Sequence, residues 1–166
     1  DPRNMGRILD KEEQVQEELE RALEEARISS EIISAIAKLY QCIVRIDLRD
    51  GRYEEIRNSD GSWPFHGTGI CTEEMHIGCG QRAEKEYQNA LIQFLDLSTL
   101  ADRMAQNETI AMEYRMGNGD WHKLRFIENK RNEDGRLTHV LCAIRSISDI
   151  KKREQELQYQ ISEAKK

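Results

Sequence analysis

The stretch TIAMEYRMGNGDWHKLRFIENKRNEDGRLTHVLCAIRSISDI, residues 109–150, decides the fold. Three strand-like runs lie at about 109–116, 121–131 and 136–147, and the first of them alternates, with Ile110, Met112, Tyr114 and Met116 on one face. Short loops that contain glycine, GNGD and NEDG, separate the runs. Alternation with a period of two is typical of half-buried strands, and such loops are typical of hairpins. The stretch therefore predicts three antiparallel strands that follow one another in a meander.

A second hairpin is predicted upstream, in the segment QCIVRIDLRDGRYEEIR. Its alternating runs flank Asp50-Gly51, a dipeptide that favours a tight turn, so we expect strands at about 42–48 and 52–57. The region from 60 to 105 lacks this alternation and contains two helical patterns, QRAEKEYQNALIQFL and LSTLADRMAQ. The order of elements predicts an α+β domain, in which one five-stranded antiparallel sheet carries short helices on one face.

A long amphipathic helix is predicted before the first strand, over about residues 10–40. Small or apolar residues recur there at alternating steps of four and three, the spacing of a coiled-coil seam. The seam consists of Val15, Leu19, Ala22, Ala26, Ser29, Ile33, Ile36 and Tyr40. We favour a parallel dimeric coiled coil; the alternative is an amphipathic helix that lies on its own domain.

The last strand is predicted to continue directly into a charged helix, because no Gly or Pro separates the two patterns. Asp149 is placed to cap the start of this helix, where a negative charge suits the helix dipole. A second seam at heptad spacing follows, interrupted by Glu154. It consists of Ile147, Ile150, Leu157, Ile161 and Ala164. We expect a signalling coiled coil, with a terminal helix that packs back on its own sheet as the alternative.

The composition excludes several classes of function. A net charge of −6 over 166 residues argues against nucleic acid as the main partner, because phosphate binding needs clustered Lys and Arg. No run approaches the about 20 apolar residues of a membrane-spanning helix, and no signal-peptide pattern is present. We therefore expect a cytoplasmic protein. Because the chain starts at Asp1 and stops within a helical pattern, we also expect it to be part of a longer protein.

The order of elements and three motifs resemble the PAS sensor domain over about residues 32–150. CIVRIDLRDGRYEEI looks like the opening strand pair of that family, and the 114–150 stretch looks like its closing meander, in which Trp121 opens the fourth strand. Ser148-Asp149-Ile150-Lys151 is similar to the Asp-Ile-Thr signature before a coiled coil, with Lys in place of Thr. Of the Pro-Asp-Asp-Arg turn found in many members, only Asp102-Arg103 is present.

This resemblance implies a sensory module of the kind attached to bacterial diguanylate cyclases (GGDEF) or sensor histidine kinases. Residues 1–31 would form an N-terminal signalling helix, 32–150 the sensory domain, and 151–166 the start of a C-terminal signalling helix. A stimulus or small ligand would act through the flanking helices of a homodimer on a C-terminal effector domain of the same longer chain. Asp149 and Ile150 would form the junction that transmits the signal.

A sheet closed by short helices can enclose a ligand cavity, and the alternation predicts which side chains would line it. These candidates are Val44, Ile46, Met112, Tyr114, Leu124, Phe126 and Leu141, or their strand neighbours. The alternative is that these side chains simply fill the core, as apolar residues at alternate positions do. The sequence leaves open whether a ligand exists and which one it is.

The His/Cys cluster HGTGICTEEMHIGC contains His66, Cys71, His76 and Cys79, a ligand set that zinc accepts. Its spacing lacks the paired motif of known zinc sites, so we expect no metal there. We expect all four cysteines of the chain, the two of the cluster together with Cys42 and Cys142, to be buried free thiols. Haem is not expected, because the helix at 81–95 contains no His, and neither Cys71 nor Cys79 lies in the Asn-Cys-Arg-Phe motif of flavin photosensors.

Catalysis within this chain is also not expected, since no Ser-His-Asp or Cys-His arrangement and no phosphate loop can be assembled from its motifs. Two other classes of function remain open at this stage. One is a plain dimerisation module without a ligand, and the other is a metal-binding or redox module built on the His/Cys cluster.

Overall fold

The computed structural model describes residues 2–59, 61 and 63–166. Contacts between residues divide the chain into two units, the first ending at Leu39 and the second spanning Tyr40–Lys166. The first unit is the helix α1 (Pro2–Ala37), whose described side chains up to Ile36 are all exposed. The sensory domain was predicted to start at residue 32, whereas the helix continues to Ala37 and the compact unit begins at Tyr40.

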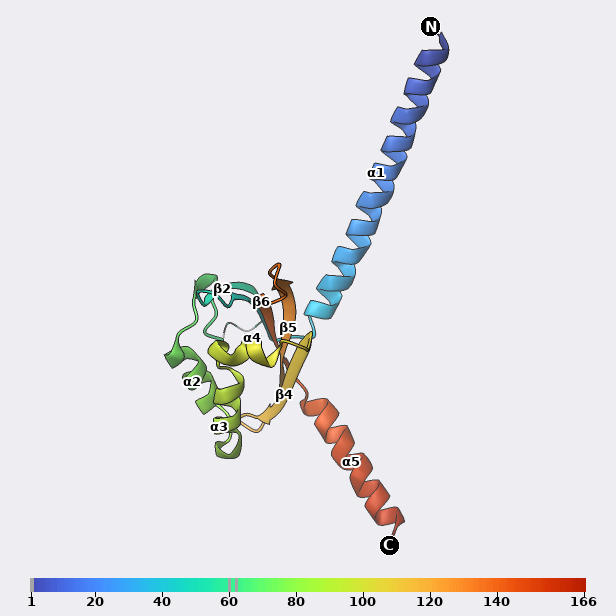
Figure 1. Ribbon diagram of the computed structural model, residues 1–166. Helices are drawn as coiled ribbons and strands as arrows, with labels where there is room; N and C mark the ends of the chain where they lie inside the picture. Colours follow the sequence, from blue (N-terminus) through green and yellow to red (C-terminus); the bar gives the residue numbers. More distant parts are fainter. Residues whose placement is uncertain (1, 60, 62) are drawn as a thin grey trace. The chain divides into compact units, whose positions relative to one another are not determined.

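The second unit is built on one antiparallel sheet (Figure 1). Its strands lie in the order β3-β2-β1-β6-β5-β4. The strands are β1 (Cys42–Asp47), β2 (Arg52–Asn58), β3 (Thr68–Ile70), β4 (Thr109–Arg115), β5 (Trp121–Arg131) and β6 (Leu137–Ser146). The helices are α2 (Glu73–Gln81), α3 (Lys85–Phe94), the 3-10 turn η1 (Leu97–Thr99), α4 (Leu100–Arg103) and α5 (Ser148–Ala164). Helices α2 to α4 lie together on one face of the sheet (Figure 1). The predicted α+β class, the meander and the short helices on one face are confirmed.

The sheet has six strands, so the predicted number of five is wrong. The additional strand β3 pairs with the edge strand β2, with Gly69 opposite Tyr53. A side chain at Gly69 would meet the Tyr53 ring, since a Cβ built there lies 2.6 Å from the tyrosine Oη. Glycine therefore lets this segment approach β2 closely, but a three-residue strand with a central glycine shows no alternation that could predict it.

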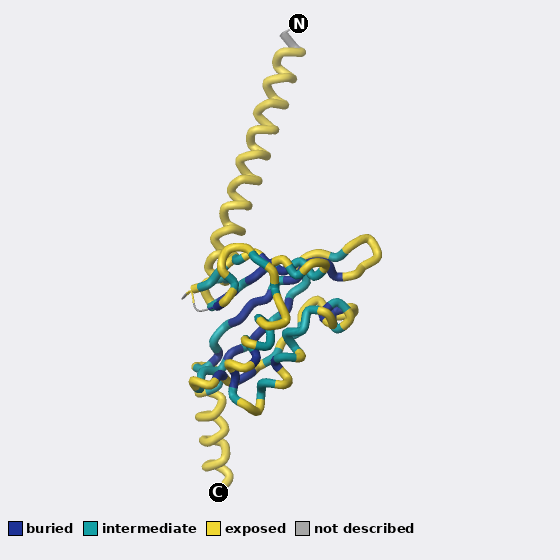
Figure 2. The backbone as a smooth tube through the Cα atoms, turned by 90° about the vertical axis from the view of Figure 1, so that its left-hand side faces the viewer, coloured by how far each residue is buried: buried dark blue, intermediate teal, exposed yellow. Residues whose placement is uncertain are grey.

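The core lies between the sheet and the short helices. On β1, β5 and β6 the inward residues are buried, and Val44, Cys142 and Phe126 are neighbours across three adjacent strands. Leu91, Leu100 and Met104 cover them from the helices and are almost fully buried. Burial is concentrated in the strands, whereas α1 and nearly all of α5 are exposed (Figure 2). The interior is therefore that of a single-sheet α+β domain.

None of the described helices is both long enough and apolar enough to cross a membrane.

Candidate functional site

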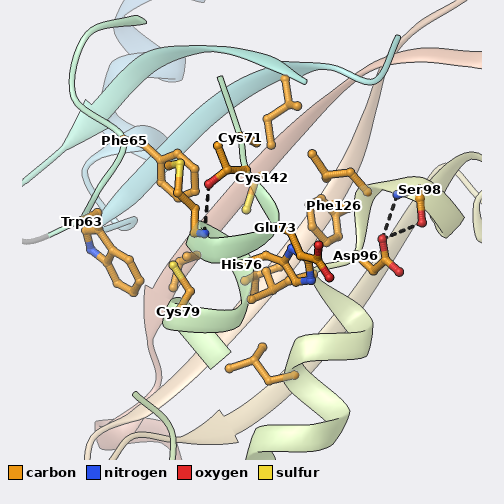
Figure 3. Close-up of a pocket in the computed structure, with 18 of the residues that line it drawn as sticks. Trp63, Phe65, Cys71, Glu73, His76, Cys79, Asp96, Ser98, Phe126 and Cys142 are labelled. Atoms are coloured by element: carbon orange, nitrogen blue, oxygen red, sulfur yellow. Dashed lines mark hydrogen bonds between the residues drawn. The ribbon is translucent and has the colours of Figure 1, made fainter. Parts of the chain in front are cut away.

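A cavity of about 420 Å³ lies between the sheet and the segment that contains α2, α3 and η1 (Figure 3). The sheet provides its apolar floor from β1, β4, β5 and β6. The floor residues are Ile46, Tyr114, Leu124, Phe126, Cys142 and Ile144. Such a volume lies within the range of about 300–1,000 Å³ that is typical of small-molecule sites.

The opposite wall comes from the loop after β2 and from the short helices. Trp63 and Phe65 contribute aromatic rings, and Met75 and Cys79 extend from α2. The hydroxyl of Thr72 accepts a hydrogen bond from the Met75 amide at 3.2 Å and so caps α2. This cap fixes the start of the helix beside the cavity, and the wall is therefore partly held by local hydrogen bonding.

One end of the cavity is polar. Glu73, His76, Asp96 and Ser98 lie together there, from the start of α2 and from the turn before η1 (Figure 3). Asp96 Oδ1 accepts hydrogen bonds from the Ser98 amide at 3.0 Å and from the Ser98 hydroxyl at 2.7 Å. These bonds, helped by the nearby His76 and Arg103, lower the pKa of Asp96 below its usual value. Asp96 is therefore an ionised and oriented acceptor at neutral pH.

The structure brings four of the seven predicted cavity residues together around this space: Ile46, Tyr114, Leu124 and Phe126. Val44 is fully buried in the core without lining the cavity, and Met112 is partly buried against the same core. Leu141 lies opposite Arg45 and Ile127, on the other face of the sheet from Cys142. Its strand neighbour Cys142 lines the cavity instead.

The helical side of the cavity was not predicted from the sequence. Trp63 and Phe65 lie in a loop without periodicity, and Asp96 and Ser98 belong to a turn. For Asp96 and Ser98, the one available signal is the Ser/Thr/Asp pattern of FLDLSTLADR, which is typical of a capped helix start. That pattern predicts a turn but not the face on which its side chains lie. Trp63 and Phe65 have no such signal.

Three free thiols line the cavity: Cys71 and Cys79 of the His/Cys cluster, and Cys142 of β6. Burial raises the pKa of Cys71 to about 11, and it also raises the pKa of Cys79 and Cys142. These thiols are therefore protonated at neutral pH and act as polarizable apolar surface rather than as nucleophiles.

The four candidate metal ligands of the sequence do not come together as one set. Cys71, His76 and Cys79 line the cavity, whereas His66 lies outside it, with its Nδ1 3.5 Å from the Asn58 amide nitrogen. In the described part of the chain, no three His, Cys, Asp or Glu side chains are arranged to hold a metal ion. The geometry thus provides no metal centre among those residues.

A hydrogen-bonded junction joins the sheet to the start of α5. Asp120, in the turn before β5, accepts hydrogen bonds through Oδ1 from Ser146 at 2.9 Å and from Ser148. Its Oδ2 lies 2.9 Å from His122 Nε2. Burial raises the pKa of Asp120, but the bonds from Ser148, Ser146 and His122 outweigh burial and lower it overall. One carboxylate therefore links the ends of two strands to the first residue of the helix.

The first turn of α5 is held from its other side by Lys151. Its Nζ forms an ion pair with Glu113 of β4 at 2.8 Å and lies 4.9 Å from the centre of the Trp121 ring. Glu113 therefore raises the pKa of Lys151, which stays protonated. Lys151 thus connects the helix to β4 and β5 at once.

Asp149 does not cap this helix, so that prediction is wrong. Ile147 occupies the N-cap position, and Asp149 lies within the first turn. The Ser148 hydroxyl takes the local contacts instead: it accepts from the Trp121 amide at 3.0 Å and donates to Asp120. Ile147 is buried, whereas Ile150 is 40% exposed. The role of Asp149 and Ile150 as a signalling junction stays a prediction.

His122 connects the cavity wall to the junction. The centre of its ring lies 5.7 Å from the ring centres of both Trp63 and Tyr114, two residues that line the cavity. Its Nε2 contacts Asp120, while its buried Nδ1 has no hydrogen-bond partner among the described residues. A shift of either aromatic ring would therefore act through His122 on Asp120, which holds Ser148, the first residue of α5.

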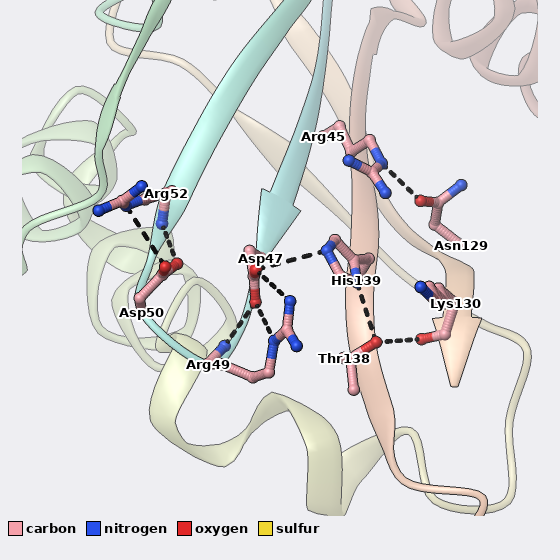
Figure 4. Close-up of polar contacts among 9 residues, drawn as sticks. All are labelled: Arg45, Asp47, Arg49, Asp50, Arg52, Asn129, Lys130, Thr138 and His139. Atoms are coloured by element: carbon pink, nitrogen blue, oxygen red, sulfur yellow. Dashed lines mark hydrogen bonds and ion pairs between the residues drawn. The ribbon is translucent and has the colours of Figure 1, made fainter. Parts of the chain in front are cut away.

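A separate polar cluster lies at the end of β1, away from the cavity (Figure 4). Asp47 accepts hydrogen bonds from the Arg49 amide at 3.0 Å and from its guanidinium at 2.7 Å, and lies 3.4 Å from His139 Nε2. The Arg49 bonds hold the pKa of Asp47 far below its usual value, although burial opposes them. Arg49 lies two residues after Asp47, so these bonds hold the start of the β1–β2 turn. The contact with His139 ties this end of β1 to the neighbouring strand β6.

An antiparallel sheet whose one face carries short helices around an internal cavity defines the class, a small α+β domain with a pocket. No family model matches the sequence, and no curated protein matches it. Among solved structures, a sensory box histidine kinase/response regulator from Burkholderia thailandensis matches with a TM-score of 0.50 and 13% identity, covering 81% of this chain and 97% of that one. A second match is the domain of a protein described as a light and redox sensing histidine kinase from Haloarcula marismortui. It has a TM-score of 0.40 and 15% identity, over 70% and 98% of the two chains. The compact unit has the fold of a PAS sensor domain, as the sequence motifs predicted.

Proposed function

We propose that this chain is a sensory module that binds a small molecule in the cavity and passes the change to α5. The observation that carries the proposal is the position of His122, whose ring lies against two cavity residues and whose Nε2 contacts the carboxylate that holds the first residue of α5. A ligand that moves Trp63 or Tyr114 would therefore bias the contacts of Asp120 and Ser148. Such a bias is a population shift between two arrangements of the helix start.

The output side of the proposal rests on the flanking helices. Apolar seam residues of both helices are exposed in the single chain, among them Val15, Leu19, Leu157 and Ile161. Two copies of the chain would bury these residues against each other as coiled coils. A C-terminal effector, a diguanylate cyclase or a histidine kinase, would then respond to the geometry of the dimer. We place this module in the cytoplasm, where both kinds of effector find their nucleotide substrates.

The first test is native mass spectrometry of the purified chain, compared with its mass after denaturation. A ligand appears as extra mass that is lost on denaturation. Leu124→Phe, which adds volume to the cavity floor, should reduce the occupied fraction, whereas Leu157→Phe on the exposed face of α5 should leave it unchanged.

Hydrogen exchange then tests the sensing step on the same samples. Exchange of the amides at 148–152 should differ between the occupied and the emptied chain, because the proposal couples the cavity to the start of α5. Identical exchange in the two states would contradict sensing. A chain with neither extra mass nor a bindable ligand would favour the plain dimerisation module instead.

A further inference from the structure

The charged side chains that line the cavity point to the chemical class of its ligand. Glu73 and Asp96 line it, and none of the described lining residues is Lys or Arg. Arg82 and Arg103 lie near the cavity without lining it. Arg82 lies 5.6 Å from the Trp63 ring centre, and Arg103 donates to the Phe94 and Asp96 carbonyls at 2.8 and 2.9 Å. The polar end of the cavity therefore presents two carboxylates, and His76 is the one described lining side chain that can carry a positive charge beside them.

Asp96 is arranged as a hydrogen-bond acceptor for a bound group. Both of its side-chain hydrogen bonds from Ser98 end on Oδ1. Its Oδ2 makes no hydrogen bond with any described residue and stays available (Figure 3). A carboxylate whose orientation is already fixed binds a cation without a further ordering cost. Charge-assisted hydrogen bonds of this kind are shorter and stronger than neutral ones.

The rest of the cavity is apolar and polarizable. The rings of Trp63, Phe65 and Phe126 line it together with protonated thiols. An anionic ligand would face Glu73 and Asp96 with no lining Lys or Arg to neutralise it, and uncompensated like charges oppose binding. A neutral apolar ligand would leave the acceptor oxygens at the polar end unused.

We infer that the cavity binds a hydrophobic amine in its protonated form, with the ammonium group at Asp96 and Glu73 and an aromatic tail over the sheet floor. This inference rests on the proposed function, because it specifies the ligand of the same cavity. The volume of about 420 Å³ suits a compact molecule with one or two rings.

The test uses three probes that share one skeleton and differ in charge: 4-phenylbutylamine, 4-phenylbutan-1-ol and 4-phenylbutanoate. Their affinities for the full chain are measured by isothermal titration calorimetry at neutral pH. The amine should bind about tenfold or more tightly than the alcohol, since a hydrogen bond to a charged group contributes more than a neutral one. The carboxylate should bind most weakly.

Two variants and a matched control locate the effect. Asp96→Asn keeps the oxygen that caps η1, and Glu73→Gln removes the second charge; each should reduce the advantage of the amine over the alcohol several-fold. Glu74→Gln removes one charge from the same first turn of α2 but does not line this cavity, and should leave that ratio unchanged. Thermal unfolding of each variant checks that the fold is intact.

The possible failures are distinguishable. If the alcohol or the carboxylate binds as tightly as the amine, or if Asp96→Asn leaves the ratio unchanged, the amine is the wrong class and the sensory proposal stands. If none of the three probes binds and the purified chain carries no ligand, the cavity is empty core space and both proposals fall.

Discussion

At the scale of single residues, two glycines of α2 have opposite roles although they are two positions apart. A Cβ built at Gly80 would lie 2.3 Å from Ile92 Cγ1 of α3, which is too close for any real contact. A Cβ at Gly78 meets nothing within 4 Å. Gly80 therefore allows α2 and α3 to pack closely, while Gly78 only weakens the helix.

The substitutions Gly80→Ala and Gly78→Ala should accordingly shift stability in opposite directions. We expect Gly80→Ala to lower the free energy of unfolding by about 1–3 kcal/mol, as overpacking does. Gly78→Ala should raise it by about 0.5–1 kcal/mol, because alanine favours a helix interior. Urea denaturation followed by circular dichroism measures both. Equal effects of the two substitutions would show that the α2–α3 contact is looser than described.

At the scale of elements, the strength of the sequence signal explains what could be predicted. Strands β1, β2, β4 and β5 alternate clearly, and the structure contains all of them. Strand β6 is apolar on both faces, so alternation could not show whether Leu141 or Cys142 faces the cavity. That choice depends on register with β1 and β5, which is a tertiary property.

The same limit applies to the site and to the junction. Asp96 belongs to a turn and Trp63 to an irregular loop, where no period indicates which way a side chain points. Asp149 was a reasonable cap by composition, but the Ser148 hydroxyl is engaged by Asp120 and Trp121 one residue earlier. The residue that fixes the start of α5 is therefore decided by Trp121 and Asp120, which lie 27 and 28 residues before Ser148 in the sequence. A local sequence pattern cannot reveal such distant partners.

The junction itself yields a prediction about α5. Asp120→Ala would remove the shared acceptor of Ser146 and Ser148, and so should loosen the first turn of the helix. We expect the amides at 148–152 to exchange about tenfold faster, since losing such bonds costs on the order of 1 kcal/mol at a partly exposed site. Asp134→Ala, in the exposed turn before β6, is the control and should leave α5 unchanged. Unaltered exchange in Asp120→Ala would remove this carboxylate from the transmission route.

At the scale of the whole molecule, the question is what covers the apolar side chains of the two flanking helices. In the single chain Leu19 is 56% exposed and Ile33 is 65% exposed, although both lie on the heptad seam of α1. Isolated helices gain little stability from propensity alone and depend on a packed face. A long helix with an unburied seam therefore favours association with a second copy through that seam.

Sedimentation equilibrium of the chain and of two α1 variants tests this association. Leu19→Gln removes one seam side chain from each copy, and should raise the dissociation constant of the dimer at least about tenfold, because burying a leucine contributes about 1.5–3 kcal/mol. Glu18→Gln changes the adjacent residue, off the seam, to the same side chain and should have little effect. A chain that is monomeric at all concentrations, or a dimer that Leu19→Gln does not weaken, would contradict the coiled coil. Signalling through α5 would then have to act within one chain, by changing how its first turn is held at Asp120 and Lys151.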